Sequence, residues 1–296
     1  MKAVIREGCR LFYCVVFRFL WNEINNVSLS QEITNRNQMI KAVFFDIDGT
    51  LVSFKTHKLT DTTIEALNQL REKGIKVFIA TGRKLESINN LGTQEFDGYI
   101  TLNGAYCVLG KDKVIYKHPM DAEDIKALIH YIEHEEKFPC GLVEEDGIYL
   151  NYKDQAAQEV FDLIKFPEPP IRPLSENKGK DVYQLIAFFT AGQEERIMAV
   201  IPHCEATRWH PAFADVVPQG SSKAVGIDKI CEHFGISLEE TMAFGDGGND
   251  MAMIQHAGIG VAMGNAGDEV KAVADYVTTS VDEDGVLNAL KHFGVL

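Results

Sequence analysis

The chain has 296 residues, of which 46% are hydrophobic and 24% charged, and 43 acidic against 29 basic side chains give a net charge of −14. This composition is that of an ordinary globular protein, so it excludes a disordered acidic tail, a coiled coil and a collagen-like repeat. The acidic balance argues against nucleic acid or a membrane as partner, and any anionic substrate would need positive charge supplied locally. The six cysteines include no C-x-x-C pair, which favours reduced thiols and a cytoplasmic location.

The first 38 residues differ from the rest in charge. They carry five basic and three acidic side chains, so the remaining 258 residues have a net charge of −16. Residues 11–20 form an apolar run after a basic start, but Arg18 interrupts it and no cleavage site follows. We expect residues 1–38 to be an extension outside the fold, as a start codon assigned ahead of Met39 would produce. A membrane-associating or export segment and a helix docked on the domain are the alternatives.

From Met39 onward, strand-like and helical segments alternate along the chain. Short apolar runs that end in polar residues are typical of buried parallel strands, and helical patterns follow them. This alternation predicts an α/β fold, a doubly wound parallel sheet with helices on both faces. The four clearest strand-like runs are 41–46, 75–81, 98–104 and 241–246.

The middle of the chain has a different pattern. Two helical stretches, 122–135 and 155–164, lie among strand-like runs instead of alternating with them one by one. We therefore expect an α+β module at 119–211, inserted into a core that is formed by 39–118 and 212–296. The strand-like runs of this module are 147–152, 182–189 and 205–210.

Polar residues follow each of the four core runs. Because open parallel sheets bind ligands beyond the carboxyl ends of their strands, we expect these residues to lie together. Crowded carboxylates repel one another unless a cation lies among them, and oxygen ligands with few His or Cys select Mg²⁺. The residues are Asp46, Asp48, Thr81, Gly82, Arg83, Asn103, Asp246, Asn249 and Asp250, with Lys223 at the start of a helix before the last run.

Such a set can transfer a phosphoryl group. Asp46 can attack phosphorus to form an aspartyl-phosphate, and Asp48 can protonate the leaving oxygen and then activate water. The Thr81 hydroxyl, the Lys223 ammonium and backbone amides would hold the phosphoryl oxygens. We assign Arg83 no part in the chemistry, since a solvated arginine explains it equally well.

Five motifs stand in a fixed order along the chain, and together they resemble the haloacid dehalogenase superfamily of phosphatases. The resemblance is to the Cof-type subgroup, in which a Rossmann-like core carries a large inserted α/β cap. It covers about residues 39–296 and is strongest in the core. The motifs are DIDGTLV (46–52), IATGR (79–83), LNGA (102–105), SSKAVGI (221–227) and FGDGGND (244–250).

The resemblance implies a role for each motif residue. Asp46 would be the nucleophile and a Mg²⁺ ligand, and Asp48 the general acid/base, which also binds the metal through its carbonyl. Asp246 would be the third protein ligand, and Asp250 an outer contact of the metal. The implied phosphate-binding residues are Thr81, Gly82, Asn103, Lys223 and Asn249.

The resemblance also implies a cap that closes over the leaving group of the substrate. Glu145, Arg208 and Trp209 are our candidates for contact with that group. The alternatives are strand packing for Trp209 and an exposed hairpin turn for Glu145.

We therefore expect a Mg²⁺-dependent phosphatase of small phosphomonoesters, with sugar phosphates as the first substrate class and nucleotide, flavin or pyridoxal phosphates next. A phosphomutase of hexose phosphates, a phospho-accepting sensor and an inactive sugar-phosphate-binding protein are the alternatives. No nucleic acid or membrane partner is expected, and a monomer and a small homo-oligomer both fit.

Overall fold

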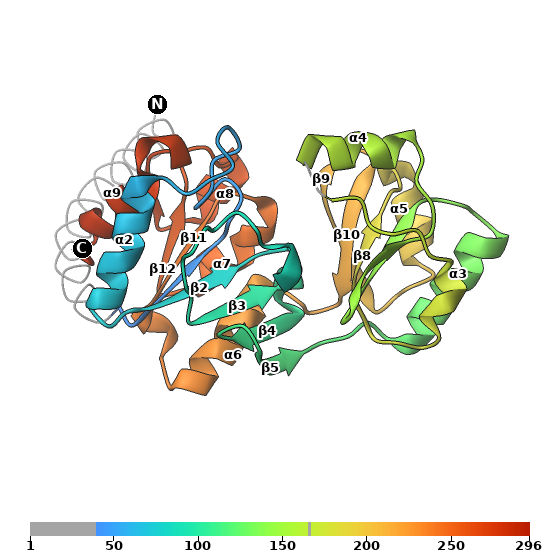
Figure 1. Cartoon of the computed structure of the whole chain (residues 1–296), viewed down its shortest axis with the longest axis horizontal. Helices are drawn as coiled ribbons and strands as arrows, with labels where there is room; N and C mark the ends of the chain where they lie inside the picture. Colours follow the sequence, from blue (N-terminus) through green and yellow to red (C-terminus); the bar gives the residue numbers. More distant parts are fainter. Residues whose placement is uncertain (1–39, 165–166) are drawn as a thin grey trace, which may run out of the picture.

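The computed structural model describes residues 40–164 and 167–296, so our expectations for residues 1–38 concern a segment outside the described residues. The described chain forms two sheets, each with its own helices, that lie side by side (Figure 1). We call the larger sheet and its helices the core. The smaller sheet and its helices, residues 122–218, lie between two core segments in the sequence, and we call them the inserted module. Within the described residues, no helix has the length and apolar character needed to cross a membrane.

The core sheet has eight strands in the order β13-β12-β11-β1-β2-β3-β4-β5. The first six of these run parallel, which confirms the predicted doubly wound sheet. The chain builds outward from β1 in both directions, so the strand order reverses between β1 and β11, where such sheets bind ligands. The parallel strands are β1 (Ala42–Phe45), β2 (Lys76–Ala80), β3 (Gly98–Thr101), β11 (Thr241–Gly245), β12 (Ile259–Ala262) and β13 (Tyr276–Val277).

Two further strands, β4 (Tyr106–Leu109) and β5 (Lys113–Lys117), add to one edge of the core sheet in antiparallel pairing. The sequence analysis did not include them: β4 is only 4 residues long, and β5 is the largely exposed outermost strand. Short 3-10 helices connect several elements of the chain. They are η1 (Leu85–Ser87), η2 (Leu102–Gly104), η3 (Leu174–Asn177), η4 (Leu238–Glu240), η5 (Gly248–Asp250) and η6 (Val281–Glu283).

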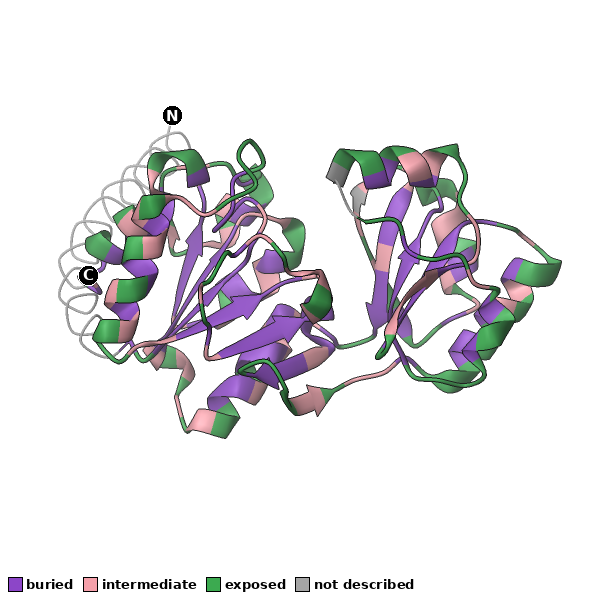
Figure 2. Ribbon diagram, in the orientation of Figure 1, coloured by how far each residue is buried: buried purple, intermediate pink, exposed green. Residues whose placement is uncertain are grey.

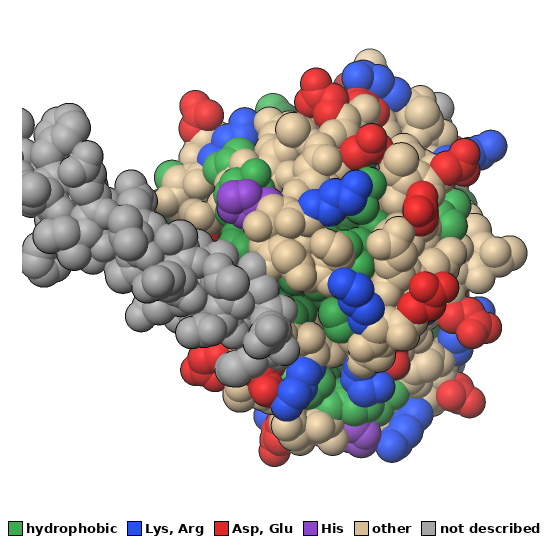
Figure 3. Space-filling view, turned by 90° about the vertical axis from the view of Figure 1, so that its left-hand side faces the viewer, with side chains coloured by type: hydrophobic (Ala, Val, Ile, Leu, Met, Phe, Trp, Pro, Cys, Tyr) green, Lys and Arg blue, Asp and Glu red, His purple; other side chains and the backbone are tan. Residues whose placement is uncertain are grey.

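Helices cover both faces of the core sheet and bury its strands (Figure 2). On one face, α2 (Asp61–Glu72) and α9 (Gly285–His292) pack through residues such as Leu67 and Leu290. On the other face lie α6 (Lys223–Phe234), α7 (Met251–His256) and α8 (Asp268–Val273). Acidic and basic side chains are interspersed on the outer side of the core that Figure 3 shows, as expected of a solvated surface.

The inserted module is an antiparallel sheet of five strands in the order β7-β6-β8-β10-β9. Helices α3 (Ala122–His134) and α5 (Ala191–Met198) pack on one face, and α4 (Gln155–Ile164) packs on the other. The sheet extends beyond the expected boundary at residue 211, because β10 pairs with both β8 and β9. The strands are β6 (Cys140–Glu144), β7 (Gly147–Leu150), β8 (Val182–Ala187), β9 (Cys204–His210) and β10 (Phe213–Pro218).

Two short segments, 118–121 and 219–222, connect the inserted module to the core. They lie close together, because the imidazole of His118 and the hydroxyl of Ser221 are 3.0 Å apart and share a hydrogen bond. The second segment leads directly into Lys223, the first residue of α6. The path back from the module therefore ends at a residue of the predicted site.

Candidate active site

The structure brings the polar residues after four core strands to one edge of the sheet. Asp46 follows β1, Thr81 follows β2, Asn103 follows β3 and Asp246 follows β11, and these strands are neighbours in the sheet. The backbone amide of Asn103 donates to the carbonyl of Thr81 over 3.1 Å, so the second and third strand ends are directly joined.

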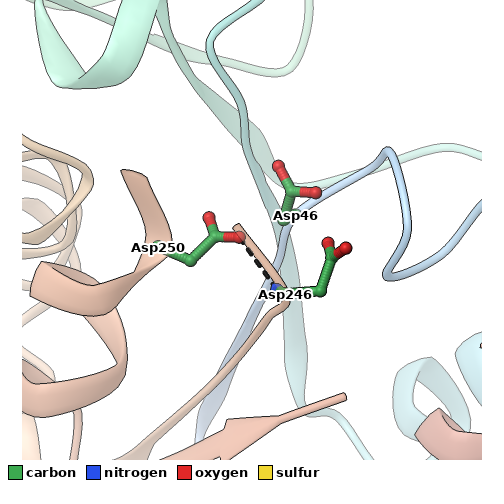
Figure 4. Close-up of side chains that lie close together, drawn as sticks. All are labelled: Asp46, Asp246 and Asp250. Atoms are coloured by element: carbon green, nitrogen blue, oxygen red, sulfur yellow. Dashed lines mark hydrogen bonds between the residues drawn. The ribbon is translucent and has the colours of Figure 1, made fainter. Parts of the chain in front are cut away.

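Three carboxylates form the centre of this site. Oxygen atoms of Asp46, Asp246 and Asp250 all lie within 4.8 Å of one another. Figure 4 shows the three side chains gathered beyond the ends of β1 and β11. Asp46 is 7% exposed and Asp250 only 1%, so water has little access to these two carboxylates.

Lys223 is the cation that the structure places among these carboxylates. Its fully buried ammonium donates to Asp46 Oδ1 over 2.7 Å and to Asp250 Oδ1 over 2.5 Å. Burial alone would lower the pKa of Lys223, but the two carboxylates outweigh it and hold the pKa above its ordinary value. Lys223 is therefore charged, and its removal would leave two buried carboxylates without their counter-ion.

One ammonium does not balance three carboxylates. Burial, followed by the charges of Asp250 and Asp246, raises the pKa of Asp46 well above its ordinary value, although Lys223 opposes the shift. Burial and the charge of Asp250 likewise raise the pKa of Asp246 to about 7. The site thus holds an excess of negative charge that a bound cation would offset.

Asp250 holds the neighbouring residues of the site through hydrogen bonds. Its Oδ2 accepts hydrogen bonds of 2.9 Å from the backbone amides of Asp246 and Gly247, while its Oδ1 accepts from Lys223. With three donors on its two oxygens, Asp250 fixes the turn that carries Asp246. This arrangement suits the outer position that the resemblance implies for Asp250.

Two residues outside our candidate set hold Asp246 in place. The Thr50 hydroxyl donates to Asp246 Oδ1 and the Asn265 amide donates to Asp246 Oδ2, each over 3.1 Å. Asn265 also donates to the carbonyl of Gly49 over 2.9 Å. Thr50 belongs to the first motif, which was a usable signal, whereas the local sequence around Asn265 gave none.

Gly49 allows the first motif to approach Asp246. It has a φ of +92°, and a Cβ at this position would lie 2.1 Å from Asp246 Oδ2. Only glycine fits such a contact and such a backbone conformation without displacing the carboxylate.

Arg83, to which we assigned no part in the chemistry, is more than a solvated side chain. Its guanidinium donates two hydrogen bonds of 2.7 Å to the carboxylate of Asp48, one to each oxygen. Both side chains are partly buried. A bidentate pair of this kind fixes the plane of the carboxylate as well as its position, so Arg83 orients the predicted acid/base.

Asn103 links three elements of the site. It has a left-handed backbone (φ 52°, ψ 32°), which asparagine tolerates better than most residues, and its Oδ1 accepts from the amide of Asn249 over 3.0 Å. Gly82 lies close by, since a Cβ there would be 3.1 Å from the Asn103 side chain. The predicted phosphate-binding residues Gly82, Asn103 and Asn249 are thus neighbours.

Glu145, a candidate in the inserted module, contacts residues of the core rather than residues of the carboxylate site. The carboxylate of Glu145 accepts from Lys117 over 2.7 Å and from the Tyr106 hydroxyl over 3.3 Å, while its backbone carbonyl accepts from Lys84 over 3.0 Å. Lys84 and Tyr106 belong to the core, so this turn of the module rests on the core.

Arg208 is tied into the module itself. Its guanidinium donates to Glu194 over 2.7 and 3.0 Å and to the carbonyl of Phe189 over 2.8 Å. These contacts indicate that Arg208 anchors β9 to α5. The side chain of Trp209 lies outside what the structure describes.

Comparison with known proteins gives matches over most of the chain. The haloacid dehalogenase-like hydrolase family matches residues 43–290. A Bacillus subtilis protein named "Putative phosphatase YkrA" is 37% identical over 261 residues, which cover 86% of this chain and 98% of that protein. The structure of the HAD subclass IIB sugar phosphatase BT4131 is 48% identical, with a TM-score of 0.78, and covers 86% of this chain and 100% of its own. BT1666 from Bacteroides thetaiotaomicron is 40% identical, with a TM-score of 0.82 and coverage of 87% and 96%.

Proposed function

This chain belongs to the haloacid dehalogenase-like hydrolases, as a Cof-type phosphatase, and on that premise we propose that it hydrolyses small phosphomonoesters with Mg²⁺ through an aspartyl-phosphate on Asp46. The observation that carries the proposal is the buried Asp46 carboxylate, which has Lys223 on one oxygen and two further carboxylates beside it. We propose further that the inserted module serves as the cap over this site.

The donor set of the site fits Mg²⁺. Its carboxylate oxygens are hard ligands of the kind that Mg²⁺ prefers, and the raised pKa of Asp246 reflects an excess of negative charge. Asp46 and Asp246 would hold the ion together with the carbonyl of Asp48, and Asp250 would support it from outside. When bound, Mg²⁺ would place positive charge against the phosphoryl oxygens of the substrate.

The residues of the chain can then share the reaction in two steps. Lys223 donates to Asp46 Oδ1, whereas Oδ2 has no hydrogen-bond partner within the described residues. Oδ2 is therefore the attacking atom in this proposal. A bond forms between Oδ2 and phosphorus while the ester bond breaks, and Asp48 gives its proton to the leaving oxygen. Asp48 next takes a proton from water, which attacks phosphorus, releases phosphate and restores Asp46.

We propose sugar phosphates as the substrate class. This choice is supported by the 48% identity to a structure that is named as a sugar phosphatase. No observation on this structure favours a phosphomutase, which would return the phosphoryl group to a sugar.

Release of phosphate from a panel of phosphomonoesters, with Mg²⁺ and with a chelator, tests the proposal. Asp46→Asn should lower the rate by more than about a thousandfold, because asparagine cannot form the acyl-phosphate. Asp112→Asn, an exchange in an exposed turn, is the matched control and should leave the rate unchanged. Phosphate release by Asp46→Asn at the normal rate would refute the mechanism, isomerised sugar phosphate would indicate a mutase, and a lasting phosphoprotein would indicate a sensor.

A further inference from the structure

Two neighbouring polar atoms of β8 are buried without a partner. Within the described residues, neither the Tyr183 hydroxyl nor Gln184 Oε1 has a hydrogen-bond partner, although the side chains are only 1% and 4% exposed. Leaving such a group unpaired in the interior is destabilising, so folds retain few of them without a reason. Two in succession on one strand therefore call for an explanation.

Both side chains project from the same face of the module sheet. The pairing of β8 with β6 shifts by one residue here: Gln184 lies opposite Val143, while Val182 lies opposite Glu144. Tyr183 is thus an extra residue in the strand, as in a β-bulge, and such irregularities re-aim side chains. Tyr183 and Val143 belong to one apolar cluster, which places Gln184 on that face as well.

Gln184 also contacts a carboxylate on the neighbouring strand. Gln184 Nε2 donates to Asp215 Oδ1 on β10 over 2.7 Å, which turns Gln184 Oε1 away from this bond. Asp215 lies opposite Ile186 of β8, another member of the same cluster, so it projects from the same face. A hydroxyl, an amide oxygen and a carboxylate therefore project from one face of β8 and β10.

The face of the module sheet that carries Tyr183 and Gln184 contacts the core near the edge where the candidate active-site residues lie. Leu102 and Ala105 of the core belong to the cluster that contains Tyr183. Leu102 directly precedes Asn103 and Ala105 lies two residues after it, and the side chain of Asn103 contacts Asn249 of the site. In addition, the ring of Tyr106 lies edge-on against the ring of Tyr183, with 5.3 Å between ring centroids. The polar groups on β8 are thus a short chain of contacts away from the phosphate-binding residues.

We propose that Tyr183, Gln184 and Asp215 form a subsite for hydroxyl groups of the leaving group, which would make phosphate esters of sugars and polyols the preferred substrates. The inference rests on the proposed function and specifies its substrate class. Gln184 Oε1 accepts a hydrogen bond, and the Tyr183 hydroxyl both donates and accepts. Because an alcohol also does both, the several hydroxyl groups of a polyol can supply a partner to each atom, whereas an aryl leaving group supplies none.

Substrate reaches this subsite when the module turns away from the core. In the present arrangement the Tyr106 ring lies against Tyr183, and the Tyr106 hydroxyl donates to Glu145. Separation at this contact uncovers Tyr183. The connecting segments 118–121 and 219–222 are the places where the chain can turn.

Two volume-conserving variants of the full chain test the subsite. We compare kcat/KM for phenyl phosphate with kcat/KM for the hexose, pentose or polyol phosphate that the unaltered chain hydrolyses fastest. Tyr183→Phe and Gln184→Met should each lower the second value by about tenfold, as expected for one lost hydrogen bond of about 1.4 kcal/mol, and leave the first unchanged. Tyr99→Phe, which removes a hydroxyl from a buried tyrosine of the core, is the matched control and should leave both values unchanged.

Thermal stability gives a second readout that a purely structural role would move in the opposite direction. Tyr183→Phe removes an unpaired buried hydroxyl, so its melting temperature should equal or exceed that of the unaltered chain. A lower melting temperature, equal losses on both substrates, or no change in selectivity would overturn the subsite. If the unaltered chain released no phosphate from any ester, the proposed function would fail first, and the subsite with it.

Discussion

The raised pKa of Asp246 predicts an unusual dependence of stability on pH. Its pKa is about 7 in the fold, against an ordinary value of 3.8 that we take for the unfolded chain. At pH values between 3.8 and about 7, the folded state binds more protons than the unfolded state, so the free energy of unfolding must fall as pH rises. Above about pH 7 this fall should end.

The size of the effect follows from the same values. A carboxyl group whose pKa is raised from 3.8 to about 7 destabilises the fold by about 4 kcal/mol once it is ionised. At about 2–4 °C per kcal/mol, the melting temperature without metal should decrease by on the order of 10 °C. Asp46 acts in the same direction, because its pKa is raised as well.

Mg²⁺ should reverse this loss at high pH and have little effect at low pH. At pH 8 the carboxylates are ionised and can bind the metal, and a concentration of about 100 times the Kd adds roughly 2.7 kcal/mol. At pH 5 the metal must displace a proton, which weakens binding. Thermal melts from pH 5 to 8, with Mg²⁺ or with a chelator, measure both effects.

Asp246→Asn separates this explanation from a general effect of pH. The variant lacks the titrating carboxyl group, so its stability should fall less with pH and its response to Mg²⁺ should disappear. Asp112→Asn should behave like the unaltered chain. The reasoning fails if the metal-free chain is as stable at pH 8 as at pH 5, or if Mg²⁺ raises the melting temperature equally at both.

Two further variants address the ion pairs of the site. Lys223→Met leaves Asp46 and Asp250 buried without their counter-ion, so chemical denaturation at pH 8 should show that the free energy of unfolding falls by about 3–5 kcal/mol. The loss should be smaller at pH 5, where a carboxylate can take up a proton, and equal losses at the two pH values would contradict this account. Arg83→Lys keeps the charge but cannot form the bidentate contact with Asp48, so kcat should fall by at least about tenfold with little change in KM; a kcat equal to that of the unaltered chain would show that this contact does not orient the acid/base.

The grouping of carboxylates at one edge of the core sheet was predictable because its signals are local. A buried run that ends in carboxylates, as at Asp46, can be recognised within a few residues. The rule that parallel strands present their carboxyl ends at one edge then places Asp246 beside it, about 200 positions away in the chain. No knowledge of side-chain contacts was needed for this step.

Contacts between distant side chains were not predictable in the same way. Nothing near Arg83 in the sequence distinguishes a partner of Asp48 from a solvated arginine, and only the adjacency of β1 and β2 brings the two together. Asn265 contacts the carbonyl of Gly49 across 216 positions of the sequence. The end of the inserted module was misplaced for a related reason, because β10 is identified as a module strand by its partners β8 and β9 rather than by its composition.

The connection between module and site limits how a cap movement can affect the chemistry. A Cβ on Gly104 would lie 1.9 Å from the carbonyl oxygen of Ser222, so the loop after Asn103 rests directly on the residue before Lys223. Ser222 also caps α6 by accepting from the backbone amide of Val225 over 3.3 Å. These contacts fix the start of α6 to the core. On the second connecting segment, the reorientation of the proposed cap must therefore be absorbed between Pro218 and Ser221, while the first segment, 118–121, turns with it. The module can then exchange leaving groups while Lys223 keeps its hydrogen bond to Asp46.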